Sequence, residues 1–280
     1  MNVTFPTSLA ELFASLAEPG ARVLAGGTDL LVRLRSGRDA SPALVSLERV
    51  PELRGIGLAD GPAGQTLRLG AASTLTEVLE HPLVRELLPV LARALAVLGS
   101  PPIRNMGTLG GNLCTASPAG DCLPPLAALG AELELASARG LRRLPLEAFL
   151  LGPGRTALVP DEVLAAVCVP LPEPGTLQHF EKVGRRNALA IAVVSLAALL
   201  RLDASGRVMD ARLAWGSVAP TVWRCPEAEA ALAGRRLTLT ALGRAAAIVR
   251  RRVRPIDDIR ASAGYRREVA GNLLLRLAEL

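Results

Sequence analysis

Residues 24–30 read Leu-Ala-Gly-Gly-Thr-Asp-Leu and place two adjacent glycines between a short apolar run and a helix start. The run at 22–24 is typical of a strand, and Thr28 or Asp29 can cap a helix that begins at Leu30. Glycine leaves the backbone open to close approach, and the N–H groups of a helix start attract an anion. A Gly-Gly pair is more often only a turn, but this strand, turn and helix start is suited to a diphosphate.

A second glycine-rich stretch follows at 105–112, which reads Asn-Met-Gly-Thr-Leu-Gly-Gly-Asn. Neither stretch is a Walker loop or the Gly-x-Gly-x-x-Gly dinucleotide fingerprint. We expect the second stretch to offer the same backbone chemistry as the first, so the pair indicates a ligand that carries a diphosphate. The chain continues to Asp121, which could accept a hydrogen bond from a ribose hydroxyl or cap the apolar stretch that follows. Both interpretations of Asp121 stay open.

Composition sets broad limits on the protein. The chain has 280 residues, half of them apolar, which is enough for two modest domains or one large one. The longest apolar run, 188–200, is shorter than the roughly 20 residues that span a bilayer, and the first residues show no secretory signal. We therefore expect a cytoplasmic protein. The four cysteines match no zinc, iron–sulfur or disulfide spacing, and two histidines are too few for a His-rich metal site.

The chain is basic, with a net charge of +6 and a pI near 10.0. Its basic residues are arginines scattered along the sequence, apart from one lysine, and aromatic residues make up 2% of the chain. Base-stacking surfaces need aromatics, so a solvated arginine-rich surface is favoured over a nucleic-acid interface. An acidic protein partner remains open, and the arginine-rich end of a predicted helix at 238–253 is a candidate docking face.

The order of predicted elements indicates a mixed α+β protein rather than strict βαβ alternation. Before residue 170 we predict helices at 8–18 and 83–98, strands at 43–47, 54–58, 66–70, 131–136 and 163–169, a turn at 60–62 and a capping box from Thr74 to Glu77. The stretch 99–125 has no sustained period and is predicted to be a functional loop. After a Pro-rich linker at 170–175 we predict long strands at 177–202 and 208–218, then helices at 225–233, 238–253 and 262–278.

Five segments together resemble one known family. They are 25–31, 103–112, 116–121 (Ala-Ser-Pro-Ala-Gly-Asp), 160–164 (Pro-Asp-Glu-Val-Leu) and 180–186 (Phe-Glu-Lys-Val-Gly-Arg-Arg). In this order they look like the FAD-binding, medium-sized subunit of molybdenum hydroxylases, the family of xanthine dehydrogenase and carbon monoxide dehydrogenase. The resemblance covers essentially the whole chain.

The resemblance implies a fold and a set of cofactor contacts. The fold would be α+β: a two-part FAD-binding domain of the vanillyl-alcohol-oxidase (PCMH) type at 1–172, then a smaller α+β domain of the carbon monoxide dehydrogenase flavoprotein type at 176–280. The implied FAD-binding residues are Val23, Leu24, Ala25, Gly26, Gly27, Thr28, Asp29, Leu30, Leu98, Thr108, Leu109, Gly110, Gly111, Asn112, Asp121, Leu164 and Lys182. No side chain would be catalytic and no metal would be bound, because the flavin carries the redox chemistry.

The resemblance also implies a function: an oxidoreductase subunit that passes electrons from iron–sulfur clusters on a partner, through non-covalent FAD, to a terminal acceptor. Molybdopterin and 2Fe-2S clusters would lie only on partners, a large and a small subunit, in a dimer of heterotrimers. The alternative is a self-sufficient FAD-dependent oxidase of the vanillyl-alcohol-oxidase type. That enzyme would need a substrate-capping domain with acid/base residues, and the last 105 or so residues are short for one. A docking protein with an eroded FAD fold is a third possibility.

Overall fold

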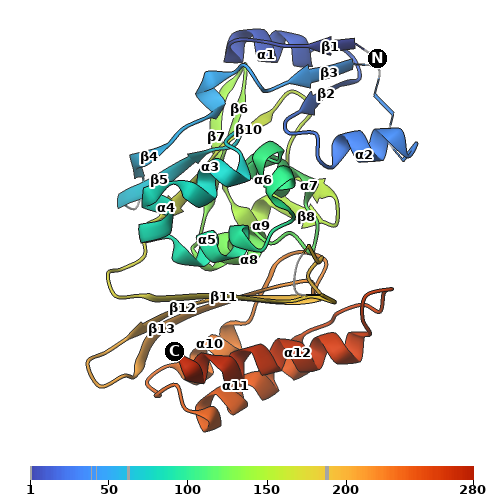
Figure 1. Ribbon diagram of the computed structural model, residues 1–280. Helices are drawn as coiled ribbons and strands as arrows, with labels where there is room; N and C mark the ends of the chain where they lie inside the picture. The colour runs from blue at the N-terminus through green and yellow to red at the C-terminus, as the bar shows by residue number, and fades with distance from the viewer. Residues whose placement is uncertain (1, 39, 42, 62–63, 187–188) are drawn as a thin grey trace. The chain divides into compact units, whose positions relative to one another are not determined.

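A computed structural model describes residues 2–38, 40–41, 43–61, 64–186 and 189–280 (Figure 1). By internal contacts the chain forms two compact units. Unit 1 comprises Met1–Leu83, Ser100–Ala116 and Ala131–Pro170, and unit 2 comprises Val84–Gly99, Ser117–Gly130 and Leu171–Leu280. Two segments that precede residue 170 thus belong to the same unit as the C-terminal part of the chain. The turn predicted at 60–62 ends on Pro62, which lies outside the described residues.

The first sheet of unit 1 is small and parallel. It has the order β1-β3-β2, with β1 at Asn2–Thr4, β3 at Ala43–Ser46 and β2 at Ala21–Leu24. Helix α1 (Leu9–Leu16) joins β1 to β2, and the Ser8 hydroxyl caps it by accepting the Glu11 N–H. Helix α2 (Leu30–Arg35) leads from β2 toward β3 and begins where the first glycine stretch predicts a helix.

The second sheet of unit 1 has five antiparallel strands in the order β4-β5-β10-β6-β7. Its central strand, β10 (Val163–Pro170), is buried at every position but the last, which explains its continuous apolar sequence. The other strands are β4 (Ile56–Gly61), β5 (Gly64–Gly70), β6 (Glu132–Ser137) and β7 (Gly140–Pro145), and the last of them was not predicted.

Short elements complete unit 1. They are the 3₁₀ helix at Pro51–Leu53, α3 (Leu75–Glu80), α6 (Pro101–Met106), α7 (Leu109–Thr115), α9 (Leu146–Phe149), and the two-stranded sheet of β8 (Leu150–Gly152) and β9 (Arg155–Thr156). The predicted capping box of Thr74 and Glu77 is confirmed at the start of α3. The prediction of an irregular stretch at 99–125 is wrong, because Ser100 and Thr108 each cap a short helix there.

A single helix at 83–98 is also not what the structure shows. Helix α4 (Pro82–Leu87) ends before Pro89, and α5 (Pro89–Ala96) begins on it. Proline has no N–H to donate to the preceding turn but fits the first position of a helix, so Pro89 divides the amphipathic pattern into two helices.

Unit 2 is built on one antiparallel sheet of order β11-β12-β13-β14. The strands are β11 (Leu177–Val183), β12 (Val194–Leu202), β13 (Val208–Gly216) and β14 (Trp223–Arg224). The prediction of one long strand at 177–202 is therefore wrong: the segment contains two paired strands, of which β11 ends at Val183 and β12 begins at Val194. The polar stretch Gly184-Arg185-Arg186 directly after β11 was the sequence sign of this break.

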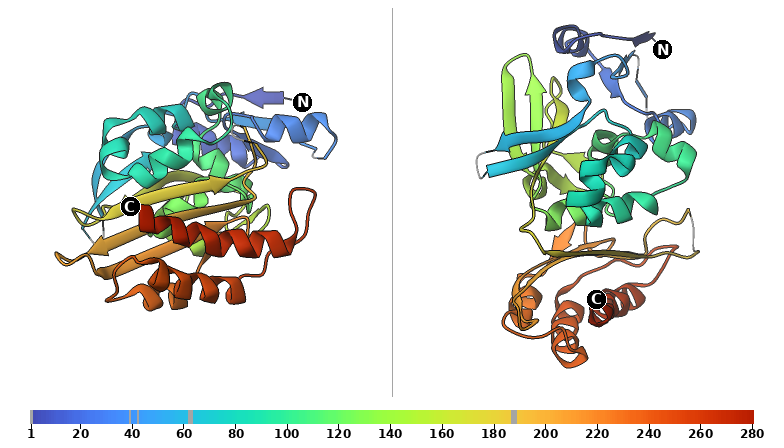
Figure 2. Two further views of the ribbon diagram at one scale, coloured as in Figure 1. Left: turned by 60° about the horizontal axis from the view of Figure 1, so that its bottom comes forward. Right: turned by 60° about the vertical axis from the view of Figure 1, so that its left-hand side comes forward.

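Helices cover both faces of this sheet. Helices α5 and α8 (Leu123–Ala128) contact β11, β12 and β13 from one side, as Figure 1 shows. On the other side lie α10 (Pro226–Leu232), α11 (Leu239–Arg252), α12 (Ala263–Leu275) and a terminal 3₁₀ turn at Arg276–Glu279 (Figure 2). Trp215 of β13 is fully buried in this core and donates its indole N–H to the Ala270 carbonyl at 3.1 Å. The three predicted helices after residue 225 are confirmed.

Candidate functional site

The first glycine stretch forms a turn with unused backbone donors. Strand β2 ends at Leu24, whose carbonyl accepts the Leu47 N–H at 2.9 Å, and Gly27 follows with a φ of +70° that favours glycine. Asp29 precedes α2, but its side chain makes no capping hydrogen bond. Across the described part of the chain, the N–H groups at 26–30 find no acceptor. Five consecutive unpaired amides are the donor set that a diphosphate requires.

The second glycine stretch has a different role. The Leu109 N–H donates to the Ser73 carbonyl at 3.0 Å, and the Gly110 N–H donates to the Ala71 carbonyl at 2.8 Å. At the start of α7, the Thr108 hydroxyl accepts the Gly111 N–H at 3.0 Å, and the Asn112 N–H donates to the Thr108 carbonyl. The expectation that this stretch repeats the donor chemistry of the first is therefore wrong for 109–112, because internal packing already uses those amides.

The two stretches lie against each other within unit 1. A Cβ on Gly26 would sit 1.7 Å from the Met106 carbonyl oxygen, so the two backbones are in direct contact there. A Cβ on Gly107 would sit 3.4 Å from the Thr28 hydroxyl oxygen. The glycines thus permit a close backbone approach that holds the donor turn in place, a requirement that the sequence does not reveal.

Asn112 supplies an acceptor that the protein itself leaves unpaired. Its Oδ1 is buried and, among the described residues, has no hydrogen-bond donor. A buried polar atom without a partner costs about 1–3 kcal/mol, so such an atom in a native structure indicates a missing ligand or water. Together with the free amides at 26–30, this atom shows that unit 1 suits a polar, diphosphate-bearing cofactor.

Leu164, also predicted to contact the cofactor, lies in β10 of unit 1. Its side chain is 4% exposed, and its register partner is Leu135 of β6. A bulge follows it, where the carbonyl of Ala165 accepts the N–H of Ala71. Leu164 is therefore a core residue whose contact with the cofactor stays a prediction.

Unit 2 brings together the other three predicted contacts. Lys182 Nζ lies 2.6 Å from Asp121 Oδ2, and both side chains are less than a tenth exposed. Lys182 also donates to the Val97 carbonyl at 3.1 Å, directly before Leu98. Residues 97–98, Asp121 and Lys182 thus form one cluster at the edge of β11. The resemblance named Asp121 and Lys182 as separate cofactor contacts. Nothing in the sequence indicated that their side chains form an ion pair.

Asp121 has the environment of a ligand-binding carboxyl group. The N-cap position of α8 is Cys122, and no side chain caps that helix, so the capping interpretation of Asp121 is wrong. Burial raises the pKa of Asp121 from 3.8 to about 6, and the neighbouring Lys182 partly offsets this shift. Oδ1, the carboxyl oxygen that Lys182 does not contact, is buried and has no donor in the described part of the chain.

The function of a chain can also depend on bound metal ions or on membrane-spanning helices. No group of three or more His, Cys, Asp or Glu side chains among the described residues could hold a metal ion. Nor does any described helix have the length and apolar character to cross a membrane. The unpaired amides at 26–30, the close glycine contact and the buried acceptors without donors among the described residues are suited to binding a nucleotide-type cofactor.

Comparison with known proteins identifies the family. Residues 1–172 match the model of the FAD binding domain in molybdopterin dehydrogenase, and residues 178–279 match that of the CO dehydrogenase flavoprotein C-terminal domain. The chain therefore belongs to the FAD-binding subunits of the molybdenum hydroxylase family. It is an oxidoreductase subunit with FAD as its cofactor, as the resemblance implied.

Similar proteins cover nearly the whole chain. The xanthine dehydrogenase FAD-binding subunit of Escherichia coli O157:H7 is 37% identical over 92% of this chain and 88% of its own length. A carbon monoxide dehydrogenase structure from Hydrogenophaga pseudoflava matches with a TM-score of 0.92 and 32% identity, covering 99% of this chain and 95% of that one. Quinoline 2-oxidoreductase from Pseudomonas putida 86 gives 0.93 and 31%, over 100% and 95%. The two-domain fold is confirmed, and a self-sufficient oxidase is not favoured.

Proposed function

We propose that this chain is the electron-transferring FAD subunit of a three-part molybdenum hydroxylase. It would receive electrons from iron–sulfur clusters on a small subunit and pass them, through FAD, to a terminal acceptor. A large subunit would carry molybdopterin, and substrate would be hydroxylated there. The names "FAD-binding subunit" and "medium chain" among the similar proteins support this division of labour.

The observation that carries the proposal is the row of amides at 26–30, none of which finds an acceptor among the residues that the structure describes. Neutral N–H groups can bind the diphosphate of FAD without a permanent charge that would need its own counter-ion. The flanking residues 23–25 and 108–112 would shape this site, and the Asn112 Oδ1 would accept a hydrogen bond from the cofactor. The FAD-binding domain would span 1–172 and the C-terminal domain 176–280.

Within unit 2, the proposed cofactor contacts are one polar group and one apolar residue. The Asp121 Oδ1 would accept a hydrogen bond from a cofactor hydroxyl, and Lys182 would hold Asp121 in position through its 2.6 Å ion pair. Leu98 would add an apolar contact. Once bound, FAD supplies the exchange of electrons, and the residues of this chain position it and exclude water.

Further features follow from the same proposal. FAD would be held non-covalently, the complex would be a dimer of heterotrimers, and it would work in the cytoplasm. The terminal acceptor and the substrate would be determined by the other subunits and by the surroundings of the bound flavin.

Co-expression tests the proposal. The tagged chain is produced with and without candidate iron–sulfur and molybdopterin subunits and purified gently, and flavin, iron and molybdenum are quantified. We expect about one FAD per chain in both preparations, acid precipitation to release it, and iron and molybdenum only when the partners are present. A chain that elutes alone in the presence of its partners and steadily oxidises a small substrate would instead support the oxidase alternative.

A further inference from the structure

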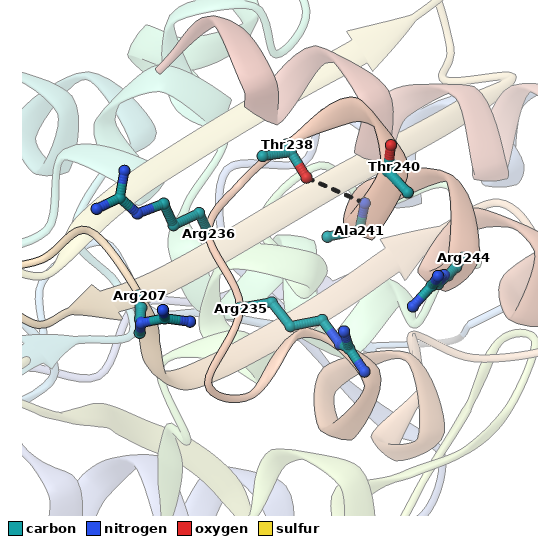
Figure 3. A pocket seen from close by; sticks show the side chains of 7 residues that line it. All are labelled: Arg207, Arg235, Arg236, Thr238, Thr240, Ala241 and Arg244. Atoms are coloured by element: carbon teal, nitrogen blue, oxygen red, sulfur yellow. Dashed lines mark hydrogen bonds between the residues drawn. The ribbon is translucent and has the colours of Figure 1, made fainter.

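Unit 2 has a pocket at the N-terminal end of α11 (Figure 3). None of the residues that line it belongs to the proposed cofactor site, which ends at Lys182 in the sequence. Its volume is about 320 Å³. Four of its seven lining residues are arginines, and none is acidic. The lining residues are Arg207, Arg235, Arg236, Thr238, Thr240, Ala241 and Arg244.

Three of the four arginines of this pocket have no acidic partner among the residues that the structure describes. Within the described residues, Arg235, Arg236 and Arg244 take part in no ion pair and no side-chain hydrogen bond. The Arg207 guanidinium donates to the Gly234 carbonyl at 3.0 Å, and the Arg207 N–H donates to Asp203 Oδ1 at 2.9 Å, so Arg207 has one carboxylate nearby. Four like charges around one concavity repel one another unless an anion lies between them. The positive charge of the pocket is therefore only partly offset within the chain, and a bound anion would lower the remaining repulsion.

At the opposite end of α11, two arginines do have acidic partners. There, Arg250 lies 2.8 Å from Glu268, and Arg252 forms an ion pair with Glu227. The expected docking face at the C-terminal end of α11 is thus partly neutralised within the chain. Around the N-terminal end of α11, by contrast, Arg235, Arg236 and Arg244 have no acidic partner among the described residues.

Backbone donors add to the charge. Helix α11 has 14 residues, and the Thr238 hydroxyl caps it by accepting the Ala241 N–H at 3.3 Å. The N–H groups of Leu239 and Thr240 find no acceptor among the described residues. The first turn of a helix carries a partial positive charge, so these amides favour an anion in the same pocket.

The arginines come from three segments that are tied together. Arg207 precedes β13, Arg235 and Arg236 follow α10, and Arg244 lies on α11. The Val208 N–H donates to the Arg235 carbonyl at 2.8 Å, which fixes the first two segments to each other. In Figure 3 the side chains of Arg235 and Arg244 extend toward one another across the pocket. The four guanidinium groups are therefore carried by backbone segments that are helical or hydrogen-bonded to a neighbouring segment.

We propose that this pocket is a binding site for a phosphate group, either inorganic phosphate or the phosphate of a small phosphomonoester. Guanidinium forks match phosphate oxygens in pairs, and threonine hydroxyls and free amides complete the donor set. Ala241 is the one apolar lining residue and no aromatic residue lines the pocket, so it offers nothing for a nucleobase to stack on. The volume is near the lower end of small-molecule sites, about 300–1,000 Å³, which fits a small phosphorylated ligand.

Calorimetry on the FAD-loaded full-length chain tests this site. Inorganic phosphate and glycerol phosphate are titrated in parallel at constant ionic strength, while flavin absorbance confirms that the cofactor stays bound. We expect one equivalent to bind and Arg235→Gln to weaken binding about tenfold, because one charged hydrogen-bonding group is worth on the order of 1.5 kcal/mol. Tighter binding of glycerol phosphate would identify a phosphomonoester as the ligand, and equal binding would identify inorganic phosphate.

A matched control separates a site from general charge. Arg201 of unit 2 is exposed and unpaired within the described residues, so Arg201→Gln removes the same charge elsewhere and should leave the affinity unchanged. Equal loss in both variants, or equal affinity for chloride and phosphate, would reduce the pocket to non-specific counter-ion binding and overturn the proposal. Saturable binding of a glutamate-rich peptide without any binding of phosphate would also overturn it, in favour of an acidic partner chain.

Discussion

The two glycine stretches of unit 1 share a composition but differ in what their backbones do. In the first, the amides at 26–30 are unpaired among the described residues. In the second, the amides of Leu109, Gly110, Gly111 and Asn112 are all bonded within the protein. Glycine-rich sequence therefore marks close backbone approach in both places, but only one of them is a donor surface.

The difference has a structural cause. The second stretch connects two short helices and is packed against the end of β5, where the Ala71 and Ser73 carbonyls accept its N–H groups. The first stretch leaves a parallel edge strand and enters a helix, so its N–H groups have no neighbouring strand to bond. The second stretch thus serves as the support against which the first is positioned, through the contact of Gly26 with the Met106 carbonyl.

The largest expected effect on stability and FAD binding comes from Gly26→Ala, which disrupts the contact between the two stretches. The added Cβ would lie 1.7 Å from a backbone oxygen, which cannot move without shifting the second stretch. We expect a loss of ~3 kcal/mol in the free energy of unfolding, at the upper end of overpacking effects. We also expect FAD to be lost, measured as flavin absorbance per chain after gel filtration.

Gly110→Ala is the matched comparison for this prediction. Its Cβ would meet Ala71 at 2.7 Å, within the supporting stretch and away from the free amides. We expect a measurable loss of stability, and a loss of FAD affinity in the folded fraction that is smaller than that of Gly26→Ala, because the free amides keep their position. Equal loss of FAD from both variants, at matched stability, would show that the two stretches do not have separate roles.

Asn112→Ala sharpens the comparison, because it tests the one buried acceptor that the supporting stretch offers. Its Oδ1 has no donor within the described protein, so removing it should leave the unfolding free energy unchanged or slightly higher. FAD affinity should fall about tenfold, as expected for the loss of one hydrogen bond to a ligand. A destabilised protein with unchanged FAD affinity, from urea unfolding and flavin titration, would assign Asn112 a structural role instead.

These differences show how far the sequence could predict the molecule. Strong amphipathic patterns placed α11 and α12 correctly, and the capping box at Thr74 was readable because both partners lie within one helical turn. Pro89 was overlooked inside a helical pattern, and the polar stretch Gly184-Arg185-Arg186 was overlooked as the break between β11 and β12. The free or bonded state of an amide, and the pairing of Asp121 with Lys182, depend on residues far along the chain, so only the structure reveals them.

The smallest expected effect is on the pH dependence of stability and concerns Asp121. Its carboxyl group titrates, whereas the backbone amides at 26–30 do not. Because burial raises the pKa of Asp121 from 3.8 to about 6, the folded protein holds this proton more tightly than the unfolded chain does. The resulting stabilisation is fully present below pH 3.8 and is lost as the pH rises through about 6. The difference in unfolding free energy between the unaltered protein and Asp121→Asn should therefore fall by about 1 kcal/mol between about pH 5 and pH 7.5.

Asp210→Asn, which removes an exposed carboxylate of the same unit, is the control for simple loss of charge. Urea unfolding of the three proteins without FAD measures this difference, and a pH-independent value for Asp121→Asn would mean that Lys182 keeps the carboxylate ionised throughout. Retention of FAD through the amides at 26–30 involves no titrating group, so the contribution of the first stretch should not change over the same range.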